Sequence, residues 1–285
     1  MVTATQLSSY LYCPRKLFIS NVLPVKEPPK EELVKGKIWH EAHDMLNKSD
    51  EKIVSGIRTG DYHEIFDIYR RRYSKILRDA ILKSKSALKE FDIKMIDLFK
   101  EYWPDFEEEA KERAYNLSIF IDKNKIYGDE LWEKLTPKIL SEQYFKSTGL
   151  NLSGVIDVIE IHDNTVYVPV ELKTGKFPDK GMWDGHRVQL AAYMMLLEDS
   201  GKTVTEAVLK YRGADRRILQ MNSFLKKEVK DLIKKCSVIL QGYDAPGYVD
   251  NKNKCKSCNF REVCYDSAEM NRLVEDIRAK LSNSK

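Results

Sequence analysis

Hydrophobic residues recur at helical spacing through the first part of the chain. A helix is predicted over residues 5–20, where Leu7, Leu11 and Leu17 follow this spacing, and Pro14 breaks or kinks it next to Cys13. The spacing resumes over residues 31–46 and continues from about residue 61 to residue 115. These segments predict N-terminal helices followed by an all-helical lobe.

After residue 138 the period changes to that of strands. Three stretches rich in Val, Ile and Tyr cover residues 138–148, 152–161 and 165–174, and Asp163-Asn164 between the last two indicates a β-hairpin. A helix is predicted over residues 184–200, two strands over 205–213 and 216–222, and a closing helix over 223–243. This order predicts a mixed α/β fold in which helices flank a mixed sheet.

Two carboxylates and a lysine fall within the predicted hairpin. Glu171 and Lys173 are two residues apart on one strand, so their side chains leave the same face. Asp157 joins them if it pairs opposite Glu171. That register also gathers apolar residues on the other face, which a one-residue slip would scatter. These residues are Ile156, Val158, Val166, Val168, Val170 and Leu172.

The same register constrains the turn of the hairpin. A two-residue turn would give the wrong parity, so a three-residue loop from Asp163 to Thr165, or a bulge, is expected. Two carboxylates beside a lysine suit a hard divalent cation and a water that attacks phosphorus. The alternative is a surface strand on which these charges are incidental.

Five cysteines divide into a group of four and a single one. Cys13 near the start and Cys255, Cys258 and Cys264 near the end could close one metal site that ties the two ends together. Either a 4Fe-4S cluster or tetrahedral zinc would use four thiolates. Cys236 lies in an apolar helical pattern and is predicted to be buried. The odd count and the lack of a long apolar run favour a reducing, cytoplasmic location without membrane contact over disulfides.

Overall charge says little about partners, because 48 basic residues nearly balance 44 acidic ones to give a net charge of +4. The positions of the basic residues are more informative. Several lie near the carboxylates or beside Cys13, and with nearby tyrosines they could form a groove for a DNA backbone and unpaired bases. Ordinary solvated surface is the alternative. The residues are Arg15, Lys16, Lys210, Arg212, Arg216 and Arg217, with Tyr10, Tyr12 and Tyr193.

Three short motifs resemble a known family in their order and spacing. GVIDV, ELKTG and QLAAY are similar to the Gly-x-x-Asp, (Asp/Glu)-x-Lys and Gln-x-x-x-Tyr motifs of the RecB-like branch of the PD-(D/E)XK nucleases. With YLYCPRK and CKSCNFREVC, the chain resembles the iron-sulfur nucleases of the CRISPR-associated Cas-four type. The resemblance covers roughly residues 5–45 and 138–265.

The resemblance implies roles for individual residues. Metal ligands for Mn²⁺ or Mg²⁺ would be Asp157, Glu171, the carbonyl of Leu172 and His40. The lysine of the second motif, Lys173, would be catalytic, and the third motif, Gln189 and Tyr193, would orient it and contact the DNA backbone. Glu142 would bind a second metal or hold a water. The four cysteines would hold a 4Fe-4S cluster.

The function implied by the resemblance is that of a metal-dependent deoxyribonuclease. It would act as an exonuclease on single-stranded DNA or single-stranded ends, with endonuclease action as a further activity, and trim fragments for CRISPR spacer acquisition. Its partners would be a CRISPR integrase and an accessory adaptation subunit. Two alternatives remain: a stand-alone recombination or repair nuclease of the RecB or AddB kind, and a non-catalytic iron-sulfur scaffold that binds DNA.

Four regions are expected. Residues 1–48 would form N-terminal helices with one cluster cysteine and the metal-site histidine, and residues 49–136 an α-helical insertion. Residues 137–245 would form the nuclease core, and residues 246–285 the iron-sulfur segment. The insertion is longer than the shortest members of the family lead one to expect, and it could contact a partner or a second copy, or roof the DNA channel.

Overall fold

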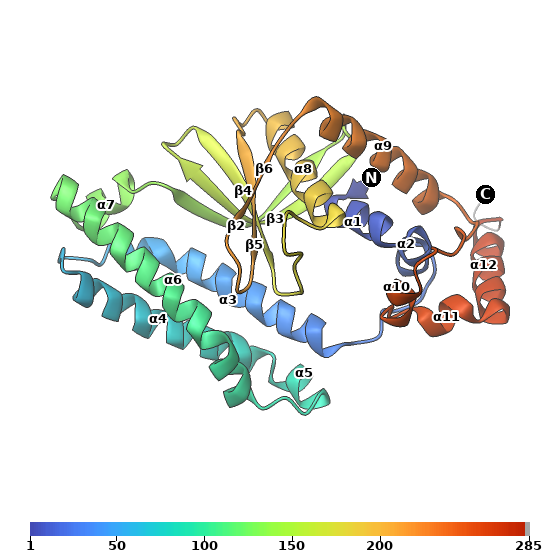
Figure 1. Ribbon diagram of the computed structural model, residues 1–285, viewed down its shortest axis with the longest axis horizontal. Helices are drawn as coiled ribbons and strands as arrows, with labels where there is room; N and C mark the ends of the chain where they lie inside the picture. Colours follow the sequence, from blue (N-terminus) through green and yellow to red (C-terminus); the bar gives the residue numbers. More distant parts are fainter. Residues whose placement is uncertain (283–285) are drawn as a thin grey trace.

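A mixed sheet with helices on both faces forms the centre of the computed structural model, which describes residues 1–282 (Figure 1). The strand order is β1-β3-β4-β5-β6, and β2 pairs with β3. Strands β2 and β4 run antiparallel to β3, whereas β5 runs parallel to β4. The predicted fold class, a mixed sheet flanked by helices, is confirmed.

The strands are β1 (Val2–Thr3), β2 (Lys138–Ser147), β3 (Leu152–His162), β4 (Val166–Lys173), β5 (Glu206–Tyr211) and β6 (Arg217–Gln220). The helices before the central strands are α1 (Ala4–Tyr12), α2 (Pro14–Asn21), α3 (Glu31–Val54), α4 (Tyr62–Lys83), α5 (Lys85–Glu90), α6 (Met95–Asn124) and α7 (Gly128–Lys134). The later helices are α8 (Asp184–Asp199), α9 (Ser223–Gln241), α10 (Lys252–Lys256), α11 (Arg261–Tyr265) and α12 (Ser267–Ser282).

The break at Pro14 is present as predicted. Helix α1 ends at Tyr12, Cys13 has an extended backbone, and α2 begins at Pro14. Proline is favoured at the first position of a helix because its missing N–H has no partner there in any case. The thiol of Cys13 accepts a hydrogen bond from the Lys16 N–H and so caps α2.

The hairpin has the predicted register and loop. Val158 pairs with Val170 and His162 with Val166, so residues 163–165 form a three-residue loop. Asp163 and Asn164 in this loop have positive φ angles, 50° and 60°, which Asn and Asp tolerate better than most residues. The pairing ends at Val158–Val170, and the two strands separate beyond it.

One residue of the predicted apolar face is misplaced. Val158, Val168, Val170 and Leu172 form one buried cluster as expected, with Val166 packed against it, but Ile156 lies in the cluster on the opposite face. The prediction for Ile156 was wrong because the alternation of side chains breaks between residues 156 and 158. At the same level β2 is irregular, with a φ of 50° at Glu142, although its pairing register with β3 is the same on both sides of this residue.

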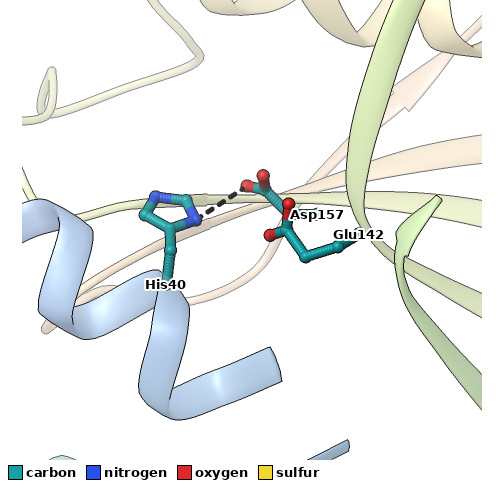
Figure 2. A group of neighbouring side chains, drawn as sticks. All are labelled: His40, Glu142 and Asp157. Carbon is teal, nitrogen blue, oxygen red and sulfur yellow. Dashed lines mark ion pairs between the residues drawn. The ribbon is translucent and has the colours of Figure 1, made fainter. Parts of the chain in front are cut away.

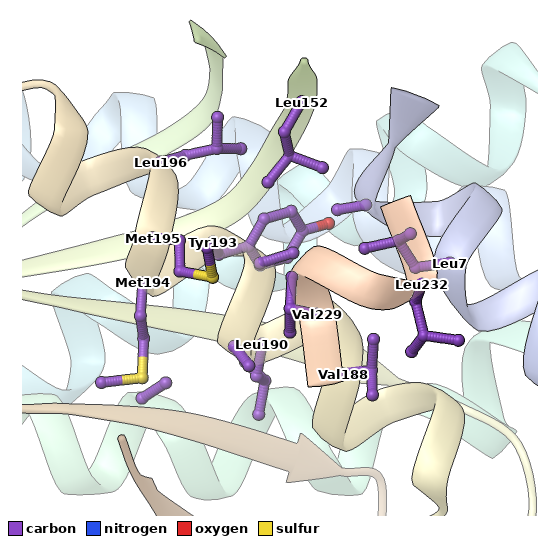
Figure 3. Packing of buried hydrophobic residues seen from close by; sticks show 14 of the residues in the cluster. Leu7, Leu152, Val188, Leu190, Tyr193, Met194, Met195, Leu196, Val229 and Leu232 are labelled. Carbon is purple, nitrogen blue, oxygen red and sulfur yellow. The ribbon is translucent and has the colours of Figure 1, made fainter. Parts of the chain in front are cut away.

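Helix α8 is the centre of the larger core. Its residues Leu190, Tyr193 and Leu196 are buried against Leu152 of β3 and Leu7 of α1 (Figure 3). Helix α9 covers the outer side of this layer. The other face of the sheet is covered by a helical lobe that packs α3 against α4 and α6 around its own apolar cluster (Figure 1).

The two ends of the described chain meet on one side of the molecule (Figure 1). Phe18 of α2 packs in one cluster with Phe260 and Met270, and the Tyr12 hydroxyl donates a hydrogen bond to the Lys254 carbonyl. Helix α3 runs continuously through the expected boundary at residues 48 and 49, and the division into four regions stays a prediction. Within residues 1–282 no helix combines the length and the apolar character needed to cross a membrane.

Candidate active site and metal centre

Three elements that are distant in sequence bring possible metal ligands together. His40 comes from α3, Glu142 from β2 and Asp157 from β3, and their ligand atoms lie within 4.8 Å of one another (Figure 2). Asp157 and Glu171 are the first residues beyond the last β3–β4 pair. The site therefore lies at the fork where these two strands separate.

Asp157 is held by a side chain and by the backbone. The Nδ1 atom of His40 lies 3.5 Å from Oδ2 of Asp157, and the Leu172 N–H donates a 2.9 Å hydrogen bond to the same oxygen. Burial works against charge on either side chain, but their mutual attraction outweighs it. The pKa of His40 is therefore raised, and the pKa of Asp157 is lowered.

Glu171 is only 2% exposed, an unusual position for a carboxylate. Its Oε1 accepts hydrogen bonds from Nζ of Lys173 at 2.5 Å and from the amide of Gln189 at 2.7 Å. Burial and the nearby charge of Asp157 raise the pKa of Glu171 to about 7. Its Oε2 is buried and has no hydrogen-bond partner within residues 1–282. Such an orphaned acceptor is costly unless a cation satisfies it.

Gln189 links the carboxylate to the rest of the predicted motif. Its Oε1 accepts a hydrogen bond from Lys173 at 3.3 Å, and its Nε2 donates to Glu171 and, at 2.8 Å, to the Tyr193 hydroxyl. Burial raises the pKa of Tyr193, so the phenol stays neutral. The structure thus brings these side chains together, but the predicted contact of Gln189 and Tyr193 with DNA is wrong, because their side chains are buried beneath the fork and only 2% and 1% of each residue is exposed.

The donor set suits a divalent cation. One imidazole and three carboxylates surround the fork, and oxygen-rich sets of this kind suit Mg²⁺ and Mn²⁺. The unpartnered Oε2 of Glu171 agrees with such a site. The residues present therefore fit a metal ion.

Asp44 was missed by the sequence reasoning. Its carboxylate accepts a 2.6 Å hydrogen bond from the Ser141 hydroxyl, which ties α3 to β2 directly beside Glu142. Asp44 follows His40 by four residues, so both lie on the same face of α3. That spacing was the available signal. Asp44 thus helps to position His40 over the fork.

The four predicted cysteine ligands line one small pocket, together with Tyr12 and Arg15. They are Cys13, Cys255, Cys258 and Cys264. Nε of Arg15 donates to Sγ of Cys264 at 3.2 Å, while burial raises the pKa of this thiol. Cys236 is fully buried elsewhere, in the core beneath α9, as predicted.

Three of the basic residues expected in a DNA groove are instead paired with acids. Nζ of Lys210 lies 3.2 Å from Glu109. Arg212 binds both Glu101 and Asp105 of α6 at 2.8 Å, and Arg216 contacts both oxygens of Glu160. These partners offset part of the charge that would attract a phosphate, and the role of Lys210, Arg212 and Arg216 in a DNA groove stays a prediction.

Curated relatives resemble parts of this chain. The CRISPR-associated exonuclease Cas4 of Rhodospirillum rubrum and a Cas4/endonuclease Cas1 fusion of the same organism are each 26% identical over 121 residues, or 41% of this chain. The DNA replication ATP-dependent helicase/nuclease dna2 of Schizosaccharomyces pombe is 24% identical over 282 residues, or 93% of this chain. The matches span only 36%, 21% and 18% of those proteins, respectively.

A solved structure, that of SSO0001, matches with 20% identity and a TM-score of 0.32, and it covers 58% of this chain and 79% of its own. A TM-score this low carries no argument. A sequence model of the PD-(D/E)XK nuclease superfamily, in contrast, matches residues 1–265. Because this match includes the forked hairpin, α8 and the residues around all four pocket cysteines, the chain belongs to the PD-(D/E)XK nuclease superfamily.

Proposed function

We propose that the protein is a metal-dependent deoxyribonuclease that degrades single-stranded DNA from an end. The observation that carries the proposal is the fork between β3 and β4. There the ligand atoms of His40, Glu142 and Asp157 lie close together, and the neighbouring strand holds Lys173 and Glu171, whose Oε2 has no hydrogen-bond partner in residues 1–282. Two clustered carboxylates would repel a phosphate unless a cation lay between them. The arrangement therefore suits hydrolysis better than simple DNA binding.

His40, Asp157, Glu171 and the Leu172 carbonyl would hold Mn²⁺ or Mg²⁺, and Glu142 is placed to add a further oxygen. When bound, the cation would polarise the scissile phosphate and lower the pKa of a water. The Leu172 N–H and the His40 imidazole orient Asp157 for this role. His40 would have to be neutral to bind the metal.

Lys173 supplies the positive charge at the reacting phosphate. Its ammonium lies between Glu171 and Gln189 at the end of β4, and its side chain is 24% exposed, so it reaches the surface of the fork. Charge that develops on the phosphate oxygens is stabilised by such a fixed cation. Gln189 is hydrogen-bonded to both Lys173 and Glu171, and the Tyr193 hydroxyl accepts a further hydrogen bond from the Gln189 amide.

For the pocket of four cysteines we propose a 4Fe-4S cluster rather than zinc. All four sulfurs line the same pocket, and either group would use four thiolates. The support for the cluster is the resemblance of YLYCPRK and CKSCNFREVC to the iron-sulfur nucleases. The role of the cluster would be to join α2 to the α10–α11 segment.

The physiological role that we propose is the trimming of DNA for CRISPR spacer acquisition, in the cytoplasm. Its support is the similarity to a Cas4 exonuclease and to a protein in which Cas4 is fused to the endonuclease Cas1. The integrase of such a system would be the partner. A second candidate role, in DNA replication or repair, is favoured by the similarity to the helicase/nuclease dna2, which extends over 93% of this chain.

The experiment is digestion of single-stranded DNA, labelled at the 5′ or the 3′ end, by anaerobically purified protein with Mn²⁺ or Mg²⁺. The wild type is compared with Lys173→Ala of equal iron content and with Lys235→Ala, which removes an exposed lysine on α9. Digestion by the wild type and Lys235→Ala, but not by Lys173→Ala, is expected. If neither the wild type nor the variants cut DNA that they bind, the protein is a scaffold.

A further inference from the structure

Strand β2 continues past the metal site with side chains that the proposed chemistry does not use. Beyond Glu142, the exposed residues on this strand are Tyr144 and Lys146. They follow one another at two-residue spacing, which places them about 7 Å apart on one face. On β3 their partners are Val155 and Ser153.

This row lies on the face of the sheet that α3 crosses. Phe145, between Tyr144 and Lys146, packs into the core beneath α8, so its two neighbours point the other way. Gly154 contacts Tyr193 of α8, and Val155 next to it is therefore also turned toward the α3 side. His40 reaches the metal site from α3. The row thus extends from the metal site along the same face.

Tyr144 and Val155 form an exposed apolar pair. Tyr144 is 62% exposed, and Val155 opposite it is 43% exposed. Within the described chain, the Tyr144 side chain makes no hydrogen bond, ring contact or cation contact. An aromatic ring that is ordered on a strand, open on one face and free of partners can stack an unpaired base.

Lys146 is exposed and has no ion-pair partner in residues 1–282. This distinguishes it from Lys210, Arg212 and Arg216, whose charges acidic side chains already neutralise. A free lysine in line with an apolar platform and a metal site matches the chemistry of a nucleotide strand, which alternates phosphates and bases. In duplex DNA the bases are paired and stacked with one another, so they are not free to stack on the ring of Tyr144.

We propose that Tyr144, Val155 and Lys146 form a binding track for unpaired DNA leading away from the metal site. Tyr144, supported by Val155, stacks on the base next to the phosphate held at the fork, and Lys146 contacts the following phosphate. The inference rests on the proposed nuclease function and deepens it. It assigns the preference for single strands chiefly to Tyr144 and Lys146, which lie outside the three family motifs, while Val155 is an x position of the first motif.

The first test measures binding of a fluorescent 15-mer of dT by the complete protein in Ca²⁺, at two salt concentrations. Tyr144→Ala is expected to weaken binding about tenfold, since stacking on an aromatic side chain contributes about that much per base. Tyr144→Phe keeps the platform and is expected to bind as the wild type does. Lys146→Gln is expected to weaken binding and to reduce its salt dependence by about one charge.

Two matched controls separate the track from general surface effects. Leu140→Ala removes a 41%-exposed side chain from the same strand but the opposite face, because Ile139 and Ser141 on either side of it point toward the lobe. Lys235→Gln removes an exposed lysine from α9. Both are expected to bind DNA as the wild type does.

The second test exchanges one base at a time for an abasic site, in wild type and in Tyr144→Ala. In the wild type one abasic position next to the cleaved bond is expected to weaken binding about as much as Tyr144→Ala does. In the variant the same position should have no further effect, because the stacking partner is already missing. The track would be overturned if abasic sites weakened binding at every position by the same amount in the wild type and in Tyr144→Ala. It would also be overturned if Tyr144→Ala bound and cleaved DNA as the wild type does. If the wild type bound DNA but did not cleave it, the proposed function itself would be overturned.

Discussion

The ring of Tyr193 occupies the space in which a side chain at position 154 would begin. A Cβ atom on Gly154 would lie 2.9 Å from Cε1 of Tyr193 and 3.3 Å from the Cβ of Ala4. The glycine of the first family motif is thus required by the tyrosine of the third. This contact lets α8 approach β3 closely enough for Gln189 to reach Glu171.

Gly154→Ala is therefore expected to lower the free energy of unfolding by about 1–3 kcal/mol, as overpacking of a core does. Activity should fall as well, because Tyr193 and Gln189 are displaced together. Urea denaturation monitored by circular dichroism measures the first effect. Gly247→Ala is the control, since a Cβ there meets no atom within 4 Å. Equal loss in both variants would contradict the packing argument.

Gln189→Leu keeps the approximate volume of the side chain but removes its hydrogen bonds to Glu171, Lys173 and Tyr193. Hydrogen bonds to a charged group contribute about 1.5–3 kcal/mol each. We expect cleavage to fall at least tenfold and Mn²⁺ affinity to weaken, with Tyr193→Phe showing a smaller loss. Calorimetric titration with Mn²⁺ and single-turnover cleavage measure the two effects. If Gln189→Leu bound Mn²⁺ as tightly as the wild type does, the hydrogen bond from Gln189 would not be needed to orient Glu171.

Stability should decline in acid because of His43, which lies one turn after His40 on α3. Burial lowers the pKa of His43 from 6.5 to about 4, although Glu109 opposes the shift and Lys210 and Arg113 add to it. Between pH 6.5 and about pH 4, His43 is protonated in the unfolded chain and neutral in the folded chain. Stability is therefore fully present above pH 6.5 and falls by about 3 kcal/mol as the pH drops to about 4.

The check is the unfolding free energy measured from pH 4 to pH 7.5 in wild type and in His43→Phe. The variant should show a flatter dependence, whatever its stability at neutral pH. Some slope should remain from His186, whose pKa is also lowered to about 4 by burial. Parallel curves for the two proteins would mean that His43 is not the titrating group.

Arg212 joins the lobe to the catalytic strand. Its backbone N–H donates to the Lys173 carbonyl, while its guanidinium binds Glu101 and Asp105 and lies 4.6 Å above the ring of Tyr102. Arg212→Met is expected to cost roughly 1–3 kcal/mol of stability, because Asp105 and Glu101 lose this ion pair and the rings of Trp39 and Tyr102 lose their cation. Hydrogen exchange should accelerate in α6.

Arg216→Met provides the comparison, since its side chain is 48% exposed and its ion pair with Glu160 is expected to contribute little. A similar loss of stability in both variants would show that exposure does not distinguish them.

Cys13→Ser is expected to lower the iron content and the visible absorption of the anaerobic protein, and to loosen the contact between α2 and α11. Cys236→Ala should retain the iron, because this thiol lies in the core, away from the pocket. Metal analysis and absorption spectra measure both. If wild-type protein purified from iron-replete cells contained zinc and no iron, the pocket would be assigned as a zinc site and not as a cluster site.

The sequence was sufficient for features that depend on local spacing. The hairpin register followed from requiring Asp157 and Glu171 on one face, and the three-residue loop followed from the register. Ile156 was misplaced because the alternation of side chains on β3 breaks at Asp157, opposite the positive φ of Glu142, and no local pattern encodes this break. The partners of Lys210 and Arg212 were likewise hidden, since Glu101, Asp105 and Glu109 lie about 100 residues earlier on α6.

The pocket of four thiols joins residues that are made far apart in translation. Cys264 follows Cys13 only after 250 further residues have been added. Domains fold as the chain emerges, so the sheet and the lobe can assemble before this pocket exists. Whatever group the thiols hold must consequently be delivered after Cys264 has been made. Supply of that group, and not synthesis alone, would set how quickly the finished molecule accumulates.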